Sequence, residues 1–144
     1  DPVVALRELK RVARPGSPVA VLSWGDPDRC ETRTILAAIG GLLPPPPPGA
    51  GGPFALAAPG QLEELLATAG LTPVGHGEVA QQFAFPDLDT AVRAQLTSGP
   101  ARMAIEHAGA DATAAAITAA YAGNRQPGGE YVQHNVFRYV IGTG

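Results

Sequence analysis

The stretch from residue 5 to residue 24 constrains the fold most, because a helical pattern, a stop signal and a strand pattern follow one another without a gap. Apolar side chains recur at the spacing of one helix face, and charged side chains occupy the opposite face. The predicted buried stripe consists of Ala5, Leu9 and Val12, with Leu6 and Ala13 beside it. Pro15-Gly16 ends this helix, for which the sequence predicts the range 2–13. Val19 to Leu22 is then continuously apolar, which is typical of a strand covered on both faces in a parallel sheet.

The composition predicts one folded domain. The length of 144 residues suits a single domain, and an apolar fraction of 45% predicts a core despite 18 glycines and 15 prolines. A formal net charge of −3 gives no reason to expect nucleic acid or an anionic membrane as a partner. The single cysteine, Cys30, excludes an internal disulfide and fits a reducing compartment. Because no long apolar run and no signal-peptide pattern are present, we expect a cytoplasmic protein.

Two stretches resemble one enzyme family. Asp1-Pro2, residues 5–9, residues 11–16 and the strand that ends at Trp24 resemble class I S-adenosylmethionine-dependent methyltransferases, in particular the small-molecule enzymes related to those of ubiquinone and menaquinone synthesis. In that family this stretch is the helix after the fourth strand, followed by the fifth strand. Residues 54–71 are similar to the helix that precedes the family's sixth strand.

The family's cofactor-binding signature has no match in this sequence. Neither a G-x-G-x-G loop after a first strand nor the acidic residue that binds the ribose hydroxyls is present. The resemblance therefore implies the C-terminal half of a methyltransferase, with the S-adenosylmethionine-binding residues expected upstream of Asp1 and no tight cofactor binding by this chain alone. Two other interpretations stay open: a non-catalytic binding or dimerisation module, and an unrelated α+β domain.

The resemblance also implies a sheet order. In the family the seventh strand lies antiparallel between the fifth and the sixth. The implied fold is a truncated Rossmann-like α/β half-domain with a three-stranded mixed sheet in the order 18–24, 130–141, 73–85. Helices 2–13 and 60–70 would cover it, and residues 87–122 would be a helical insertion. Along the last strand the pattern alternates, which places one set of side chains on one face and the other set on the opposite face. The two predicted sets are Tyr131, Phe137, Tyr139 and Ile141, and Val132, His134, Val136, Arg138 and Val140.

This sheet has one exposed edge. Residues 19–23 would lack the neighbouring strand that the family provides, and a flat apolar edge invites pairing with another strand. We therefore expect a homodimer through this edge.

Candidate binding residues follow from the expected site at the carboxyl ends of parallel strands. Trp24 is either an aromatic wall for the methyl acceptor or a core residue, and Asp26 is either a base or substrate clamp or a turn residue. Phe54 and Arg33 are further candidates for acceptor contact, although Arg33 also fits a solvated helix charge. They belong to residues 25–58, which form either a substrate lid or a linker. A catalytic base is not identified, and the three histidines show no metal-ligand spacing.

Overall fold

The computed structural model describes residues 1–47 and 51–144, which form two compact units. Unit 1 comprises Asp1–Arg29, Gly52–Gln81 and Val136–Gly144, and unit 2 comprises the described parts of Cys30–Gly51 together with Gln82–Asn135. The long strands β2 (Thr72–Phe85) and β3 (Tyr131–Thr143) contribute residues to both units. Residues 48–50 of the expected lid or linker lie outside the described residues.

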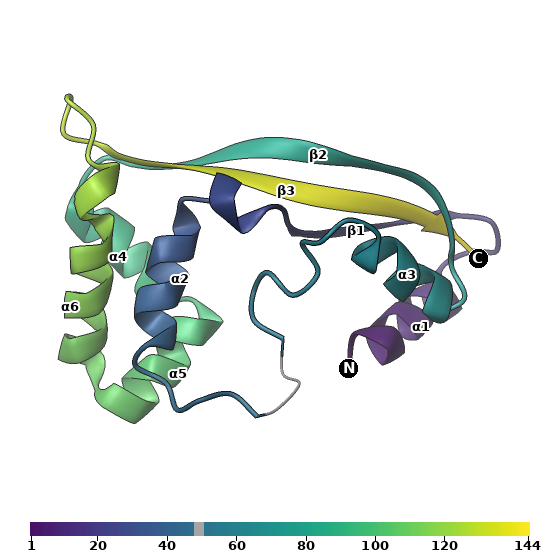
Figure 1. The fold of residues 1–144 in the computed structure, drawn as a ribbon, viewed down its shortest axis with the longest axis horizontal. Coiled ribbons are helices and arrows are strands. Elements are labelled where there is room, and N and C mark those ends of the chain that lie inside the picture. Colours follow the sequence, from purple (N-terminus) through teal and green to yellow (C-terminus); the bar gives the residue numbers. More distant parts are fainter. Residues whose placement is uncertain (48–50) are drawn as a thin grey trace. The chain divides into compact units, whose positions relative to one another are not determined.

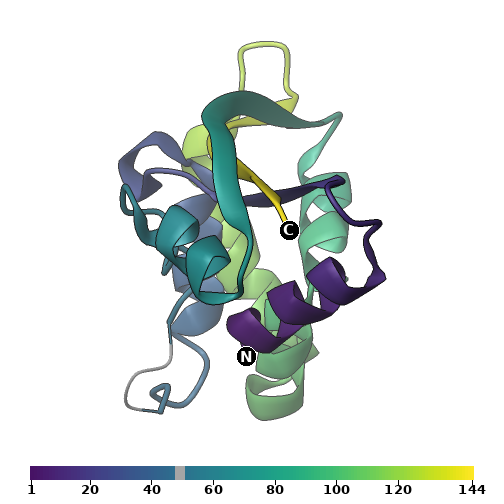
Figure 2. The ribbon, with the colours of Figure 1, turned by 90° about the vertical axis from the view of Figure 1, so that its right-hand side faces the viewer.

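Unit 1 places two helices on one face of a sheet (Figures 1 and 2). Helix α1 (Pro2–Val12) precedes strand β1 (Pro18–Trp24), and helix α3 (Gln61–Thr68) precedes β2. Asp1 caps α1, because its Oδ1 accepts hydrogen bonds from the backbone N–H groups of Val3 and Val4. Helix α1 begins at the predicted residue 2 and ends at Val12, one residue before the predicted end and ahead of the Pro15-Gly16 stop.

The sheet order is β1-β3-β2, as predicted. β1 pairs with β3 in an antiparallel register that runs from Pro18 opposite Thr143 to Trp24 opposite Phe137. β2 also runs opposite to β3, so the sheet is wholly antiparallel and its description as mixed was wrong (Figure 1). The prediction that β1 is covered on both faces was also wrong, because exposed and half-buried residues alternate along it. This alternation is what an antiparallel strand with one solvated face shows.

The core of unit 1 forms between the two helices and β3. Its buried side chains are Leu6, Leu62, Leu66, Ala69, Leu71 and Val140. Gly142 permits this close packing, since a Cβ atom there would lie 2.9 Å from Cδ2 of Leu66. The contact between α1 and α3 therefore rests on one leucine from α1 and several from α3.

The predicted buried stripe of α1 was wrong. Leu6 is 4% exposed, but Leu9 is 46% and Val12 is 63% exposed, and Ala5 is exposed as well. The face of α1 that meets the sheet also carries Lys10, whose Nζ donates to the backbone oxygen of Gly70 at 2.6 Å. Lys10 is itself exposed, so the fully buried side chain that α1 contributes to the core is Leu6, one turn before Lys10.

Unit 2 contains four helices around a second core. They are α2 (Thr32–Gly40), α4 (Leu88–Leu96), α5 (Gly99–Ala108) and α6 (Ala110–Ala120), and a 3-10 helix at Tyr121–Asn124 follows. The buried side chains are Ile35, Ile39, Ala91, Val92, Ala101, Ala104, Ile117 and Tyr121. The three alanines let helix backbones approach closely, because they add little side-chain volume between α4, α5 and α6. The helical character predicted for residues 87–122 is therefore observed.

Two leucines of α1 test which face of the helix is buried. We expect Leu6→Ala to lower the free energy of unfolding by about 2–5 kcal/mol, because it removes buried methyl groups and leaves a cavity. Leu9→Ala, the matched control on the same helix, should change it by no more than about 0.5 kcal/mol, since Leu9 is 46% exposed. Urea denaturation followed by circular dichroism measures both values. Equal losses for the two variants would contradict the observed orientation of α1.

Candidate functional site

A cleft of about 450 Å³ lies in unit 1 next to the carboxyl end of β1. Its volume falls in the range of pockets that bind small molecules. The residues that line it are Asp26, Pro27, Arg29, Phe54, Ala57, Ala58, Pro59, Glu78 and Arg138. They come from the turn after β1, the segment before α3, β2 and β3, so that four separate parts of the sequence meet here.

Gly25 sets where the turn after β1 begins. Its backbone N–H donates to the oxygen of Val136 at 2.8 Å, and a Cβ atom at residue 25 would lie 2.8 Å from that same oxygen. A larger residue would therefore push β1 away from β3. The chain next forms a short 3-10 helix at Pro27–Arg29, in which Oδ1 of Asp26 accepts a hydrogen bond from the Asp28 N–H at 2.9 Å. This Asx turn holds the Asp26 carboxylate at the cleft.

Three aromatic rings stack beside the cleft. The ring centroids of Trp24 and Phe137 are 4.6 Å apart with an angle of 28° between the ring planes, and those of Trp24 and Phe54 are 5.6 Å apart at 50°. Such offset and tilted pairs are favourable arrangements of aromatic rings. Phe54 lines the cleft, and Trp24 contacts Phe54 without being one of the lining residues. Trp24 thus has a packing role, and its contact with Phe54 places it one residue away from the cleft.

Both arginines of the cleft face a carboxylate. Nη2 of Arg138 donates to Oε1 of Glu63 at 2.7 Å, and Nη1 donates to the backbone oxygen of Ala58 at 3.0 Å. The Arg138 side chain is only 12% exposed, so this ion pair is shielded from water. Nη1 of Arg29 lies 2.6 Å from Oε2 of Glu78 in a more exposed pair. Asp26 is thus the only lining carboxylate for which the described residues record no ion pair.

The structure brings together three of the four candidate residues predicted from the sequence. Asp26 and Phe54 line the cleft, and Trp24 contacts Phe54. Arg33 is not among the lining residues, and it is an exposed residue in the first turn of α2, which belongs to unit 2. The sequence analysis missed the role of Arg138. A charged residue in the same predicted strand face as Val136 and Val140 was the available signal, because buried charges are rare unless they are paired.

A second, smaller hollow of about 270 Å³ lies beside α1 and the start of β1. Lys10, Arg11 and Arg14 are among its lining residues. Two of these cations are already engaged, Lys10 by the Gly70 oxygen and Arg11 by the carboxylate of Glu8. None of the predicted binding residues lines this hollow, so the cleft next to β1 is the candidate site.

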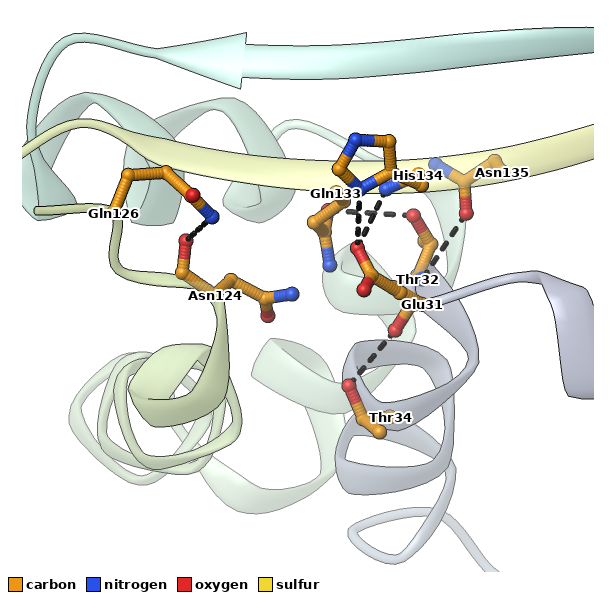
Figure 3. Close-up of polar contacts among 8 residues, drawn as sticks. All are labelled: Glu31, Thr32, Thr34, Asn124, Gln126, Gln133, His134 and Asn135. Carbon is orange, nitrogen blue, oxygen red and sulfur yellow. Dashed lines mark hydrogen bonds and ion pairs between the residues drawn. The ribbon is translucent and has the colours of Figure 1, made fainter.

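Unit 2 contains a buried polar cluster that the sequence did not predict, of which Figure 3 draws Thr32, Gln133 and Asn135. Oδ1 of Asn135 accepts a hydrogen bond from the N–H of Thr32 at the start of α2, at 3.1 Å. The hydroxyl of Thr32 and that of Tyr121 both donate to Oε1 of Gln133, at 3.3 and 3.4 Å. Gln95 completes the chain of contacts by donating to the Tyr121 hydroxyl at 3.2 Å. The cluster therefore connects α2, the 3-10 helix and α4 to β3 inside unit 2.

His134 has a structural role in this unit. Oε2 of Glu31, the residue before α2, accepts from the His134 backbone N–H at 2.6 Å and lies 3.2 Å from its Nδ1 (Figure 3). The Glu31 N–H in turn donates to the His134 oxygen at 2.9 Å. These contacts fix the start of α2 to β3. His134 is therefore a sheet residue whose backbone and ring both contact Glu31.

Two classes of feature are not found in the described part of the chain. Residues 1–47 and 51–144 include no group of three or more histidine, cysteine, aspartate or glutamate side chains placed to hold a metal ion. Within the same ranges, every helix is too short or too polar to cross a lipid bilayer.

No protein-family model matches the chain, and no curated protein matches its sequence. The sheet topology and the chemistry of the cleft are the features of the molecule that bear on its function. Both are properties of unit 1.

Burial raises the pKa of the Tyr121 hydroxyl, and the hydrogen bond from Gln95 opposes this shift. The folded chain therefore keeps this proton to a higher pH than the unfolded chain, in which tyrosine titrates near pH 10. The stabilisation is complete below that pH and is lost as the pH rises through the pKa of the folded state.

We expect Tyr121→Phe to remove the part of the tyrosinate absorbance that develops at the highest pH and accompanies unfolding. Ultraviolet titration of the variant and the parent chain, with circular dichroism on the same samples, tests this. If the absorbance removed by Tyr121→Phe develops near pH 10 while the fold persists, Tyr121 is not shielded as described.

Proposed function

We propose that this chain forms the part of an S-adenosylmethionine-dependent methyltransferase that binds a small-molecule methyl acceptor. The observation that carries the proposal is the sheet order, in which β3, the last strand of the sequence, runs antiparallel between β1 and β2. This is the order that the resemblance implies for the seventh strand between the fifth and the sixth. The cleft supports it as well, because it lies at the carboxyl end of β1, where the resemblance to a fold with parallel strands implies the acceptor.

The cleft has side chains that can bind and orient the methyl acceptor. Transfer from a sulfonium to a nucleophile depends mainly on alignment of the two reactants and on charge stabilisation. The Asp26 carboxylate can accept a hydrogen bond or a proton from an O–H or N–H group of the acceptor. The Phe54 ring supplies a flat apolar wall, and the stacking of Trp24 on Phe137 fixes that wall in place.

The described residues do not fit the cofactor itself. The sequence lacks the glycine loop that would cradle S-adenosylmethionine. Gly25, the glycine at the carboxyl end of β1, does not form an open cradle, because Val136 occupies the space next to its Cα atom. We therefore assign the acceptor side to this chain and derive no step that uses the cofactor.

Cofactor binding tests the proposal. We expect the protein translated from the complete reading frame to bind S-adenosylmethionine with micromolar affinity. Residues 1–144 alone should bind it at least about tenfold more weakly, because they lack the glycine loop. Isothermal titration calorimetry measures both. If the protein from the complete reading frame does not bind S-adenosylmethionine, the proposal is wrong.

A second candidate function is a dimerisation module, favoured by the exposed edge of β1. In the described part of the chain β1 pairs with β3 alone. Leu22, in the middle of this edge strand, is 60% exposed. An apolar edge strand of this kind pairs readily with a second copy of itself.

We expect residues 1–144 to form a homodimer through residues 19–23. Light scattering after gel filtration should give twice the 14.7 kDa mass of one chain. Leu22→Lys should give the monomer mass, because a charge on an edge strand opposes pairing. The matched control is Met103→Lys on α5, at a side chain that is 59% exposed, and it should leave the dimer intact. A monomer for the unchanged chain would remove the dimer proposal.

A further inference from the structure

We propose that the cleft next to β1 selects a ligand that carries a flat ring and a protonated amine, with the ammonium group on Asp26 and the ring against Phe54. That this ligand is the methyl acceptor rests on the proposed function. That the cleft prefers an organic cation over an anion rests on the residues of unit 1 alone.

The charges of the cleft favour a cation over an anion as the ligand. Arg29 and Arg138 are the lining cations, and each already faces a carboxylate, at 2.6 and 2.7 Å. The lining itself has two carboxylates, Asp26 and Glu78, and two guanidinium groups, but Arg138 is paired with Glu63 outside the lining, so among the described residues the Asp26 carboxylate is the negative charge of the lining without an ion pair. A bound anion would meet this charge, or would have to draw a guanidinium group away from its carboxylate. A bound cation meets a carboxylate that no described cation neutralises.

The geometry of Asp26 favours an ammonium group as its partner. Its Oδ1 accepts the hydrogen bond from the Asp28 N–H, which fixes the direction of the carboxylate. The described residues record no donor for Oδ2, and Asp26 is exposed at the cleft. A carboxylate held in this way is a suitable partner for an ammonium N–H, since hydrogen bonds between charged groups are the strong ones.

The aromatic wall of the cleft favours a ligand with a flat ring. An ammonium group is attracted to the face of an aromatic ring, and a neutral or cationic ring stacks on it. Phe54 lines the cleft together with Ala57 and Pro59, which present small apolar surfaces. Trp24 holds Phe54 at a centroid distance of 5.6 Å. A carboxylate next to an aromatic face is the combination that recognises an organic ammonium ion.

Trp24 provides a direct readout, because it is the only tryptophan of the chain and contacts the cleft wall. The probes are 2-phenylethylamine and 3-phenylpropionate, which share a phenyl ring and differ in the sign of their charge at neutral pH. We expect the amine to change the Trp24 fluorescence saturably and to bind at least about tenfold more tightly than the acid. Isothermal titration calorimetry of the same pairs confirms that a fluorescence change reports binding.

Two variants assign the preference to the cleft. Asp26→Asn keeps the size of the side chain and should lower the affinity for the amine about tenfold, while the affinity for the acid stays level or rises. Asp89→Asn, on α4 in unit 2, removes the same charge from an 80% exposed side chain and should change neither affinity. Circular dichroism verifies that both variants are folded.

Equal affinity for the two probes overturns the inference, as does an amine affinity that Asp26→Asn leaves unchanged, or the absence of binding by either method. None of these titrations requires S-adenosylmethionine. If the chain prefers the amine but the protein from the complete reading frame does not bind S-adenosylmethionine, the proposed cation site stands and the proposed methyltransferase function is wrong. Cofactor binding without amine selectivity would retain the methyltransferase and reject the cationic acceptor.

Discussion

The antiparallel pairing of β1 with β3 is the interaction on which the rest of unit 1 depends. It joins the beginning of the sequence to its end, along all residues from Pro18 to Trp24. Val140 of β3 completes the core under α1 and α3, and the Gly25 N–H extends the pairing to the Val136 oxygen. The turn that carries Asp26 starts directly after this bond. The position of the cleft therefore follows from where β1 stops pairing with β3.

The sequence predicts the elements of unit 1 well, but it does not predict which face of α1 is buried. Stop signals and apolar runs act over a few residues, so the predicted ends of α1 and β1 agree with the structure to within one residue. The side of a helix that meets the sheet depends on tertiary packing. In α1 the packing buries Leu6, with Val3 partly buried beside it, whereas the pattern of apolar residues selected Leu9 and Val12.

Strand β3 shows a second limit of sequence patterns. The buried positions of β3 do not follow one regular alternation. Gln133 and Asn135 are buried near its start, Val136 directly after them is buried as well, and Val140 and Gly142, at even-numbered positions, are buried near its end. A regular alternation placed His134 with the buried valines, and it is exposed. Buried amides are rare without hydrogen bonds. Only their oxygens have partners among the described residues, Thr32 and Tyr121, which lie about a hundred and about twelve residues away and which no local pattern reveals.

The candidate site was predictable where it follows from topology and not where it depends on ion pairing. The end of β1 led to Trp24 and Asp26, whereas Arg33 was chosen for its charge alone and lies outside unit 1. The ion pair of Arg138 with Glu63 shows why ion pairing in the site was not predictable from the sequence. A largely buried ion pair contributes little net stability, because desolvation offsets the attraction. Arg138 instead connects β3 to the Ala58 oxygen and to Glu63, and so holds the segment that carries Phe54 against the sheet. An arginine used in this way shapes the cleft without presenting a free positive charge to its ligand.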